Sequence, residues 1–226
     1  MKLLSVIIAE SALELVPVEL HRHHAVSRDA ERRGTDASRI MLDRSIHHAA
    51  MRQLENEFKR GRPDLLYLTL LSVTGAPIYQ DGLAKIFVHT LDDTVLEIEE
   101  RTRPPRSYSR FRNLLELALS ERPKAGLIRV YSSTVRSLAR ETIHADSVVG
   151  LSILGKRVTL QDLATRVLGK KNPAVVIGGF PKGHFSPETL KTLDELVRID
   201  NRPLDAHVVA SRLIYEVEKA RGGLVP

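Results

Sequence analysis

The chain has 226 residues, 42% of them hydrophobic, and its 34 basic and 28 acidic side chains give a formal net charge of +6. It contains no cysteine, which excludes disulfides, thiolate nucleophiles and cysteine-ligated zinc. No segment has the ~20 uninterrupted apolar residues of a membrane helix, and the apolar start at 3–9 is too short for a secretory signal. We therefore expect a cytoplasmic protein, and the basic excess favours a polyanionic partner if the charge is clustered.

The first third of the chain mixes apolar and charged segments. Residues 3–9 form an apolar run that predicts an interior strand. The polar segment 28–39 has alternating charges and no apolar period, so it predicts an exposed loop. Asp43 is a candidate N-cap for a helix whose apolar residues recur at helical spacing up to Gly61. Residues 65–71 form a second apolar run, which predicts a strand, with a helix as the alternative.

From residue 83 onwards the pattern is more regular. Two apolar runs at 83–90 and 95–99 flank Asp92-Asp93 and predict a hairpin, and apolar residues between 111 and 119 predict a helix. Further strands are expected at 126–131, 148–154, 174–177 and 196–199, and further helices at 135–140, 160–168, 187–193 and 206–219. Strands that alternate with helices imply an α/β fold with a largely parallel sheet covered on both faces.

The strand predicted at 174–177 runs into a glycine-rich turn at 178–183, Gly-Gly-Phe-Pro-Lys-Gly. Gly178 and Gly179 can adopt φ > 0 and let a ligand touch bare backbone, and loops at the carboxyl ends of strands are the usual small-molecule sites of open α/β sheets. This fragment alone is equally compatible with an ordinary strand exit. It lacks the full Gly-x-Gly-x-x-Gly spacing of a dinucleotide site and the Gly-Lys-Ser/Thr of a Walker loop.

The basic charge is clustered at 101–112, which contains five arginines and no acid, with Tyr108 and Phe111 between them. Arginine pairs with phosphate in a bidentate way, and aromatic rings offer stacking surfaces for unpaired bases. The segment therefore predicts binding of single-stranded or looped RNA. A solvated run of charge is the alternative.

The nine histidines raise the question of a metal, because five of them crowd into residues 21–48. No pair has the spacing and acid partner of a known zinc motif, so no metal is expected, and solvent-facing or capping roles are favoured. Ser11, Ser45 and Ser72 lie in no nucleophile elbow, which leaves hydrolase chemistry without a candidate.

Four motifs together carry a family resemblance: Leu42-Asp43 with His47, Arg-Gly-Arg-Pro-Asp at 60–64, the arginine-rich 102–111, and Val-Ile-Gly-Gly-Phe-Pro-Lys-Gly at 176–183. They resemble the archaeal and eukaryotic small-subunit ribosomal RNA pseudouridine N1-methyltransferases of the SPOUT superfamily. The resemblance runs over nearly the whole chain in the same motif order. It departs from the family at 65–67 and 77–80, and at His184 and Asp205, which affects RNA contacts more than a pocket formed mainly by backbone.

The resemblance implies a single SPOUT domain over 1–226 with a trefoil-knotted α/β fold and a family-specific extension at about 72–112. It also implies a homodimer that binds S-adenosylmethionine in the knot and small-subunit ribosomal RNA, with no metal and no membrane. By the same resemblance the cofactor-binding residues are Tyr131, Ser132, Ser133, Ile177, Gly178, Gly179, Phe180, Pro181, Gly183, Ile199, Asp200 and Leu204. The RNA-binding residues are Arg62, Arg103, Arg106 and Arg110, and the catalytic residues are Asp64 and Arg62.

Methyl transfer to N1 of pseudouridine requires the loss of the N1 proton, and Asp64, oriented by Arg62, is the candidate that accepts it or only orients the base. A structural carboxylate paired with Arg62 is the alternative. Two other functions stay open: a ribosomal RNA-binding assembly factor whose catalysis is secondary, and a nucleotide-dependent oxidoreductase that uses the glycine turn.

Overall fold

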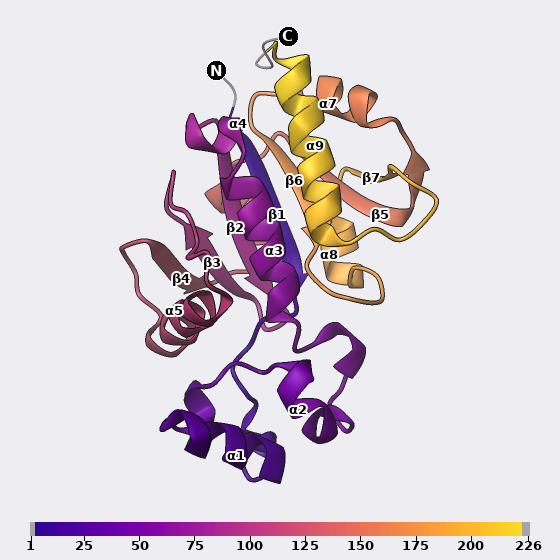
Figure 1. The fold of residues 1–226 in the computed structure, drawn as a ribbon. Coiled ribbons are helices and arrows are strands. Elements are labelled where there is room, and N and C mark those ends of the chain that lie inside the picture. Colours follow the sequence, from indigo (N-terminus) through magenta and orange to yellow (C-terminus); the bar gives the residue numbers. More distant parts are fainter. Residues whose placement is uncertain (1–2, 223–226) are drawn as a thin grey trace.

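The computed structural model describes residues 3–222, whose strands form one seven-stranded sheet with the order β4-β3-β2-β1-β6-β5-β7 (Figure 1). The strands are β1 (Leu4–Ser11), β2 (Ala84–Thr90), β3 (Thr94–Ile98), β4 (Ile128–Ser132), β5 (Ser147–Arg157), β6 (Pro173–Gly178) and β7 (Glu195–Arg198). The α-helices are α1 (His24–Arg33), α2 (Arg44–Met51), α3 (Pro63–Thr74), α4 (Pro77–Gln80), α5 (Tyr108–Glu121), α6 (Val135–Ser137), α7 (Leu160–Leu168), α8 (Pro187–Thr192) and α9 (Ala206–Ala220). A π-helical turn, Leu138–Thr142, extends α6.

The centre of the sheet is parallel. β1 pairs in parallel with both β2 and β6, and β5 pairs in parallel with β6 and β7. All eight residues of β1 and the apolar residues 174–177 of β6 are buried. This agrees with their uninterrupted apolar sequence, since parallel strands are buried on both faces. β3 is antiparallel to β2 and to β4, which confirms the predicted hairpin.

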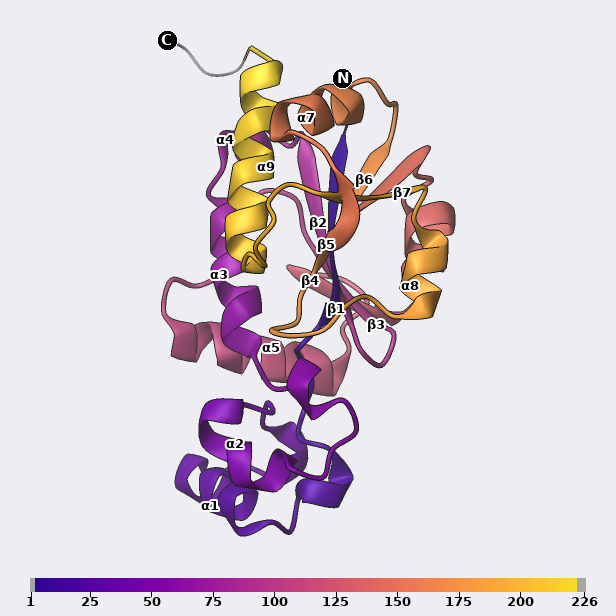
Figure 2. The same cartoon turned by 90° about the vertical axis from the view of Figure 1, so that its right-hand side faces the viewer.

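Helices cover both faces of the sheet, as predicted. One face packs against α3, α5, α7 and α9 in the larger hydrophobic core, and the other packs against α6, its π-helical extension and the segment around α8. Figure 1 shows α3 and α9 side by side, and Figure 2 shows α8 on the opposite side of the sheet. In residues 3–222 no helix is long and apolar enough to cross a membrane.

Residues 12–62, between β1 and α3, form a helical lobe below the carboxyl end of β1 (Figure 1). The lobe contains α1, α2 and three short 3₁₀ helices, Val18–Leu20, Ala37–Arg39 and Glu57–Lys59. It has its own small core, in which Val26 and Ala30 of α1 pack with residues such as Ile40 and Met51. The expected extension at 72–112 contains α4, β2 and β3, and β2 is paired directly with β1 in the sheet.

Two secondary-structure predictions are wrong. Segment 28–39 is not an exposed loop, because α1 runs to Arg33 and ends at Gly34, whose φ is 61°. Its inner face has few apolar residues and is completed by the buried carboxylate of Asp29, so no apolar period was visible. Residues 65–71 are not a strand but the middle of α3, which Pro63 opens at its first turn. The helix after Asp43 is shorter than predicted, since α2 ends at Met51.

Candidate functional site

A cavity of about 460 Å³ opens at the carboxyl ends of β5, β6 and β7. Its walls are the middle of β5 at 151–153, the loop that follows β6, and the loop between β7 and α9. Carboxyl ends of parallel strands are the usual ligand site of an open α/β sheet. Eight of the twelve predicted cofactor-binding residues line this cavity: Ile177, Gly178, Phe180, Pro181, Gly183, Ile199, Asp200 and Leu204.

The loop at 178–186, called the glycine loop below, takes its shape from close backbone contacts. Gly179 N donates to the Ala9 carbonyl at 2.8 Å, and the Gly179 carbonyl accepts from Ala12 N at 2.9 Å. A Cβ at Gly179 would lie 2.8 Å from Ser11 Cα, so only glycine fits between the loop and the end of β1. Gly179 therefore does not line the cavity, and the positive φ that Gly178 and Gly179 could adopt occurs instead at Gly183, with φ 99°.

Tyr131, Ser132 and Ser133 lie away from the cavity, contrary to their predicted place in it. Tyr131 and Ser132 are the last two residues of β4 and Ser133 follows it; β4 is antiparallel to β3 at the edge of the sheet and is separated from β6 by three strands. The wall expected from them is formed by residues 151–153, in the middle of β5, where its pairing with β6 ends at Leu151. A sequence signal for this wall existed, because β5 and β6 are joined by one helix and strands connected in this way are usually neighbours.

The cavity has an apolar interior and a cationic rim. Arg198, at the end of β7, lines it with a buried Nε that has no hydrogen-bond partner among the described residues. Asp200, also at the rim, is engaged by Arg202, whose backbone N, Nε and Nη2 lie 2.9, 3.1 and 3.2 Å from its carboxylate. These hydrogen bonds lower the pKa of Asp200 to about 2. Bare backbone, apolar walls and an unpaired guanidinium donor suit a nucleoside that carries a carboxylate.

Arg62 and Asp64 form an ion pair at the start of α3. Arg62 Nε and Nη2 donate to the two Asp64 oxygens at 2.8 and 2.7 Å, and the hydrogen bond to Asp64 raises the pKa of Arg62. The side chains are 35% and 43% exposed, so both groups remain accessible. Neither side chain lines the cavity. The charge of Asp205, in the loop between β7 and α9 that forms one wall of the cavity, also raises the pKa of Arg62. The pair therefore lies within electrostatic range of that loop.

The predicted RNA-binding arginines of the 101–112 segment are exposed. Arg103 Nη2 donates to Gln80 Oε1 at 2.6 Å, and Tyr67 OH donates to the Arg106 carbonyl, which fixes the backbone there. Arg110 lies exposed in the first turn of α5. Their exposure agrees with a phosphate-binding role.

The aromatic residues of the same segment are not free stacking surfaces. Phe111 is 1% exposed, and its ring centroid lies 4.8 Å from that of Tyr67. Tyr108 packs edge-on against Tyr67 at 5.4 Å and donates to Asp43 Oδ2 at 3.3 Å. Both rings lie on the inner face of α5, one helical turn apart, and they join α5 to α3 and the lobe. The predicted base stacking is therefore wrong for Phe111, and Tyr108 is already half-buried in this packing.

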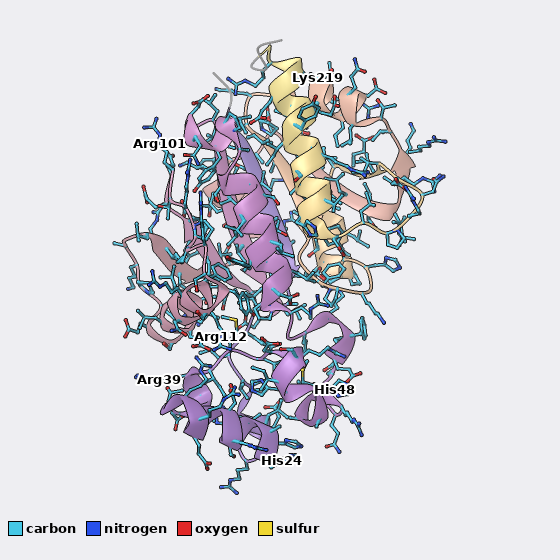
Figure 3. The ribbon with its side chains drawn as sticks, in the orientation of Figure 1. His24, Arg39, His48, Arg101, Arg112 and Lys219 are labelled. Carbon is cyan, nitrogen blue, oxygen red and sulfur yellow. The ribbon has the colours of Figure 1, made fainter. Side chains whose placement is uncertain are left out.

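Glu116 of α5 connects the helix to the helical lobe. Arg33 donates to both of its carboxylate oxygens, and Met41 N donates to Oε1 at 2.9 Å. Arg112 Nε lies 3.9 Å from the same carboxylate, at the place where α5 meets the lobe (Figure 3). No sequence pattern predicts this contact, because Arg33 and Glu116 are 83 residues apart in the chain.

The crowded histidines have local structural roles. His23 Nδ1 accepts from Ala25 N at the start of α1, and the fully buried His47 accepts from Asp43 N through Nδ1 at 3.1 Å. Burial lowers the pKa of His47. His24 and His48 are exposed on the lobe (Figure 3). Within residues 3–222 no three acidic or histidine side chains are placed to hold a metal ion together.

The α/β fold with a mostly parallel seven-stranded sheet and a cavity at its carboxyl edge agrees with the SPOUT methyltransferase fold that the family resemblance implied. The profile of the EMG1/NEP1 methyltransferase family matches residues 6–218, and the chain belongs to that family. It is 34% identical over 223 residues to the ribosomal RNA small subunit methyltransferase Nep1 of Staphylothermus marinus, covering 95% of each chain. It is 37% identical over 222 residues to the protein of the same name from Pyrobaculum islandicum, covering 96% of this chain and 98% of the relative.

A solved structure agrees with these sequence relatives. The crystal structure of Archaeoglobus fulgidus Nep1 bound to S-adenosylhomocysteine matches with a TM-score of 0.84 and 32% sequence identity. The match covers 98% of this chain and 99% of that one. The fold is therefore shared over essentially the whole length of both proteins.

Proposed function

We propose that this chain transfers a methyl group from S-adenosylmethionine to N1 of a pseudouridine in small-subunit ribosomal RNA, in the cytoplasm. The observation that carries the proposal is the cavity at the carboxyl ends of β5, β6 and β7, in a chain whose fold matches a protein bound to S-adenosylhomocysteine. The names of the Staphylothermus and Pyrobaculum relatives support the ribosomal RNA substrate. The choice of pseudouridine and of N1 rests on the motif resemblance at 60–64 and 102–111.

When bound, S-adenosylmethionine supplies a methyl group on a positively charged sulfur, which is open to attack by a nitrogen in line with it. The cavity residues would hold the cofactor mainly through backbone at the glycine loop and at the loop that begins at Ile199. Leu151, Ile177 and Val209 line the cavity and would give apolar contact for the adenosyl group. Arg198 would pair with the carboxylate of the methionine part, which gives its unpartnered Nε a hydrogen-bond acceptor.

Asp64 would act on the base that receives the methyl group. Pseudouridine carries an N1–H, and that proton must leave as the N1–methyl bond forms. Because both Asp64 oxygens already accept hydrogen bonds from Arg62, the carboxylate is held in one orientation. We therefore assign Asp64 the role of accepting a hydrogen bond from N1–H and of stabilising, by electrostatics, the transfer of that proton to water as the N1–methyl bond forms, with Arg62 as its positioning partner.

Arg62, Arg103, Arg106 and Arg110 would hold the RNA through its phosphates. They are separate in sequence, and those of the 101–112 segment are exposed. Phosphate contacts fix the position of a nucleic acid without reading its sequence. In this role they deliver a looped strand to the pair at the start of α3.

The knotted path and the homodimer are further parts of the proposal, as is the single-domain organisation. The family resemblance supports them, and two exposed apolar side chains are compatible with a partner surface: Leu68 of α3 and Tyr215 of α9, 42% and 52% exposed. These two helices lie side by side on one face (Figure 1). Light scattering at micromolar concentration tests the dimer, and a monomer there would contradict it.

The decisive experiment is single-turnover methylation of a loop oligonucleotide that carries pseudouridine, with the same loop carrying uridine as the control. We expect methylation of the first only, and a large loss in Asp64→Asn. Full single-turnover activity in Asp64→Asn would show that Asp64 has neither role. Binding of S-adenosylhomocysteine and RNA without any methyl transfer would favour the assembly factor, and binding of NAD in its place would favour the oxidoreductase.

A further inference from the structure

Lys59, at the end of the last 3₁₀ helix of the helical lobe, is a buried lysine that the proposed reaction does not use. Its side chain is 11% exposed, and its Nζ donates to Glu10 Oε2 at 2.6 Å. The same ammonium group donates to the carbonyl of His184 and lies 4.4 Å from the ring centroid of Phe180. One cation of the lobe therefore touches both the end of β1 and two residues of the glycine loop.

Glu10 links this lysine to the far end of the glycine loop. Its side chain is 5% exposed, and its Oε1 accepts a hydrogen bond from Ser186 N at 2.7 Å. Burial raises the pKa of Glu10, but the hydrogen bonds from Lys59 and Ser186 outweigh burial and hold the pKa below its ordinary value. The ionised carboxylate thus ties the loop to β1 and to the lobe at once.

The glycine loop has a hollow on the side where this pair lies. A depression of about 840 Å³ opens between the loop, the lobe and α8, and Phe58 and Lys59 form part of its wall. The backbone at Gly183 favours glycine because its φ is 99°, and Gly183 packs against that wall closely enough that a Cβ there would lie 2.9 Å from the Phe58 ring and 3.2 Å from Lys59 Cε. On its other side the same loop, through Phe180 and Gly183, lines the cofactor cavity. The pair therefore braces the loop where packing is sparse.

A neighbouring ion pair shows what a merely structural role looks like. Arg60 Nε donates to Glu14 Oε1 at 2.8 Å, and the two side chains are 18% and 20% exposed. The hydrogen bonds of the Arg60 side chain go to Glu14 and to the Glu55 carbonyl, and in the described part of the chain none goes to the glycine loop. Arg60 thus provides a matched control one residue away.

We infer that Lys59 and Glu10 are positioning residues that hold the glycine loop in the shape that closes one side of the cofactor cavity. Cofactor affinity then depends on the helical lobe, although the lobe itself does not line the cavity. The inference rests on the proposed function, because it takes S-adenosylmethionine as the occupant. Both residues act through the loop and touch none of the reacting atoms.

The test is calorimetric titration of S-adenosylhomocysteine into the full chain and into Lys59→Met, Glu10→Gln and Arg60→Met. We expect Kd to rise about tenfold or more in Lys59→Met, since a buried charged hydrogen bond to the loop is lost. Glu10→Gln keeps its size and its acceptor oxygen and should show a smaller rise. Arg60→Met should bind like the wild type, and RNA affinity, measured by anisotropy, should change in none of the three.

The outcomes separate the inference from the proposed function. A wild-type chain with no affinity for S-adenosylhomocysteine would overturn both. If Lys59→Met and Glu10→Gln melt cooperatively and still bind S-adenosylhomocysteine with the wild-type Kd, the inference alone is overturned. An equal loss of S-adenosylhomocysteine affinity in Arg60→Met would also overturn it. If Lys59→Met does not fold, Glu10→Gln and Lys59→Arg test the inference instead. The inference then requires a higher Kd in Glu10→Gln than in the wild type, and a Kd closer to that of the wild type in Lys59→Arg.

Discussion

Glu116→Gln tests the connection between α5 and the helical lobe. The substitution keeps the shape of the side chain but removes the charge that Arg33 binds from the lobe and that Arg112 approaches from α5 itself. One oxygen can still accept from Met41 N, while the new amide NH₂ meets the N–H groups of Arg33. The two arginines then face each other across a buried neutral group.

The size of the effect follows from these contacts. The side chains of Arg33 and Glu116 are 16% and 8% exposed, so solvent screens the pair little. Loss of one partner of a buried pair costs about 3–5 kcal/mol, and loss of one charged hydrogen bond about 1.5–3 kcal/mol. Arg33 retains a second carboxylate, Asp29, at 3.8 Å. We therefore expect the lower range, about 2 kcal/mol, which corresponds to a Tm lower by about 4–8 °C in a chain of this size.

The assay is urea unfolding at pH 7, together with RNA and S-adenosylhomocysteine titrations. RNA affinity should fall, because α5 carries Arg110 and begins beside Arg106, while S-adenosylhomocysteine affinity should not change, because α5 does not line the cavity. Glu97→Gln is the control, since its partner Arg129 is 44% exposed and such pairs contribute about 0–1 kcal/mol. A loss in Glu116→Gln no larger than in the control would refute the reasoning.

Three further outcomes are expected. Arg198→Ala should weaken S-adenosylhomocysteine binding but leave methylthioadenosine, which has no carboxylate, unaffected in the same calorimeter; equal losses for both ligands would reject the assigned contact. Arg110→Ala should weaken RNA binding and reduce the slope of log K against log salt by about 1, whereas an unchanged slope means no phosphate contact. The folded-state pKa of Glu10 lies below 4.5, so its contribution to stability is present above pH 4.5 and is lost as the pH falls through the folded-state pKa. The difference in the free energy of unfolding between wild type and Glu10→Gln should therefore shrink on acidification. A constant difference in urea midpoints would contradict this.

The sheet was largely predictable from the sequence, and the reason is physical. β1 and β6 are buried on both faces, so their sequences are apolar runs that a short sequence window is enough to detect. The glycine turn after β6 also predicted a ligand site at the carboxyl end of that strand, where the cavity lies. The order and orientation of the strands were harder to predict. β4 has an ordinary strand sequence, and only its pairing with β3 places it at the far edge of the sheet. The family resemblance assigns residues 131–133 to the cavity, and only the strand order places them at the far edge of the sheet, three strands away from β6.

In the helical lobe, sequence reasoning predicted α2 with Asp43 as its N-cap but missed α1. In α1 the buried face is completed by a carboxylate, Asp29, that bonds Arg32 at 2.5 Å within the same helix. A helix of this kind looks like a solvated charge run, because the apolar period is too short to detect. The contacts that matter most for the site are also non-local: Lys59 meets Glu10 from 49 residues away. Neither hydrophobic periodicity nor a sequence motif predicts an ion pair between residues so far apart in the chain.

Glu10 also carries a backbone strain that helps to explain its position. Its φ of 51° lies in the left-handed region, which costs a non-glycine residue about 1–2 kcal/mol. The turn occurs where the pairing register of β1 with β2 shifts, and it lets Glu10 N donate to His89 Nδ1 at 3.3 Å. Glycine would relieve the strain but would lose the carboxylate that holds Lys59 and Ser186 N. The conformation that costs energy is therefore the one that directs the carboxylate to the glycine loop, and the hydrogen bonds made there offset the strain.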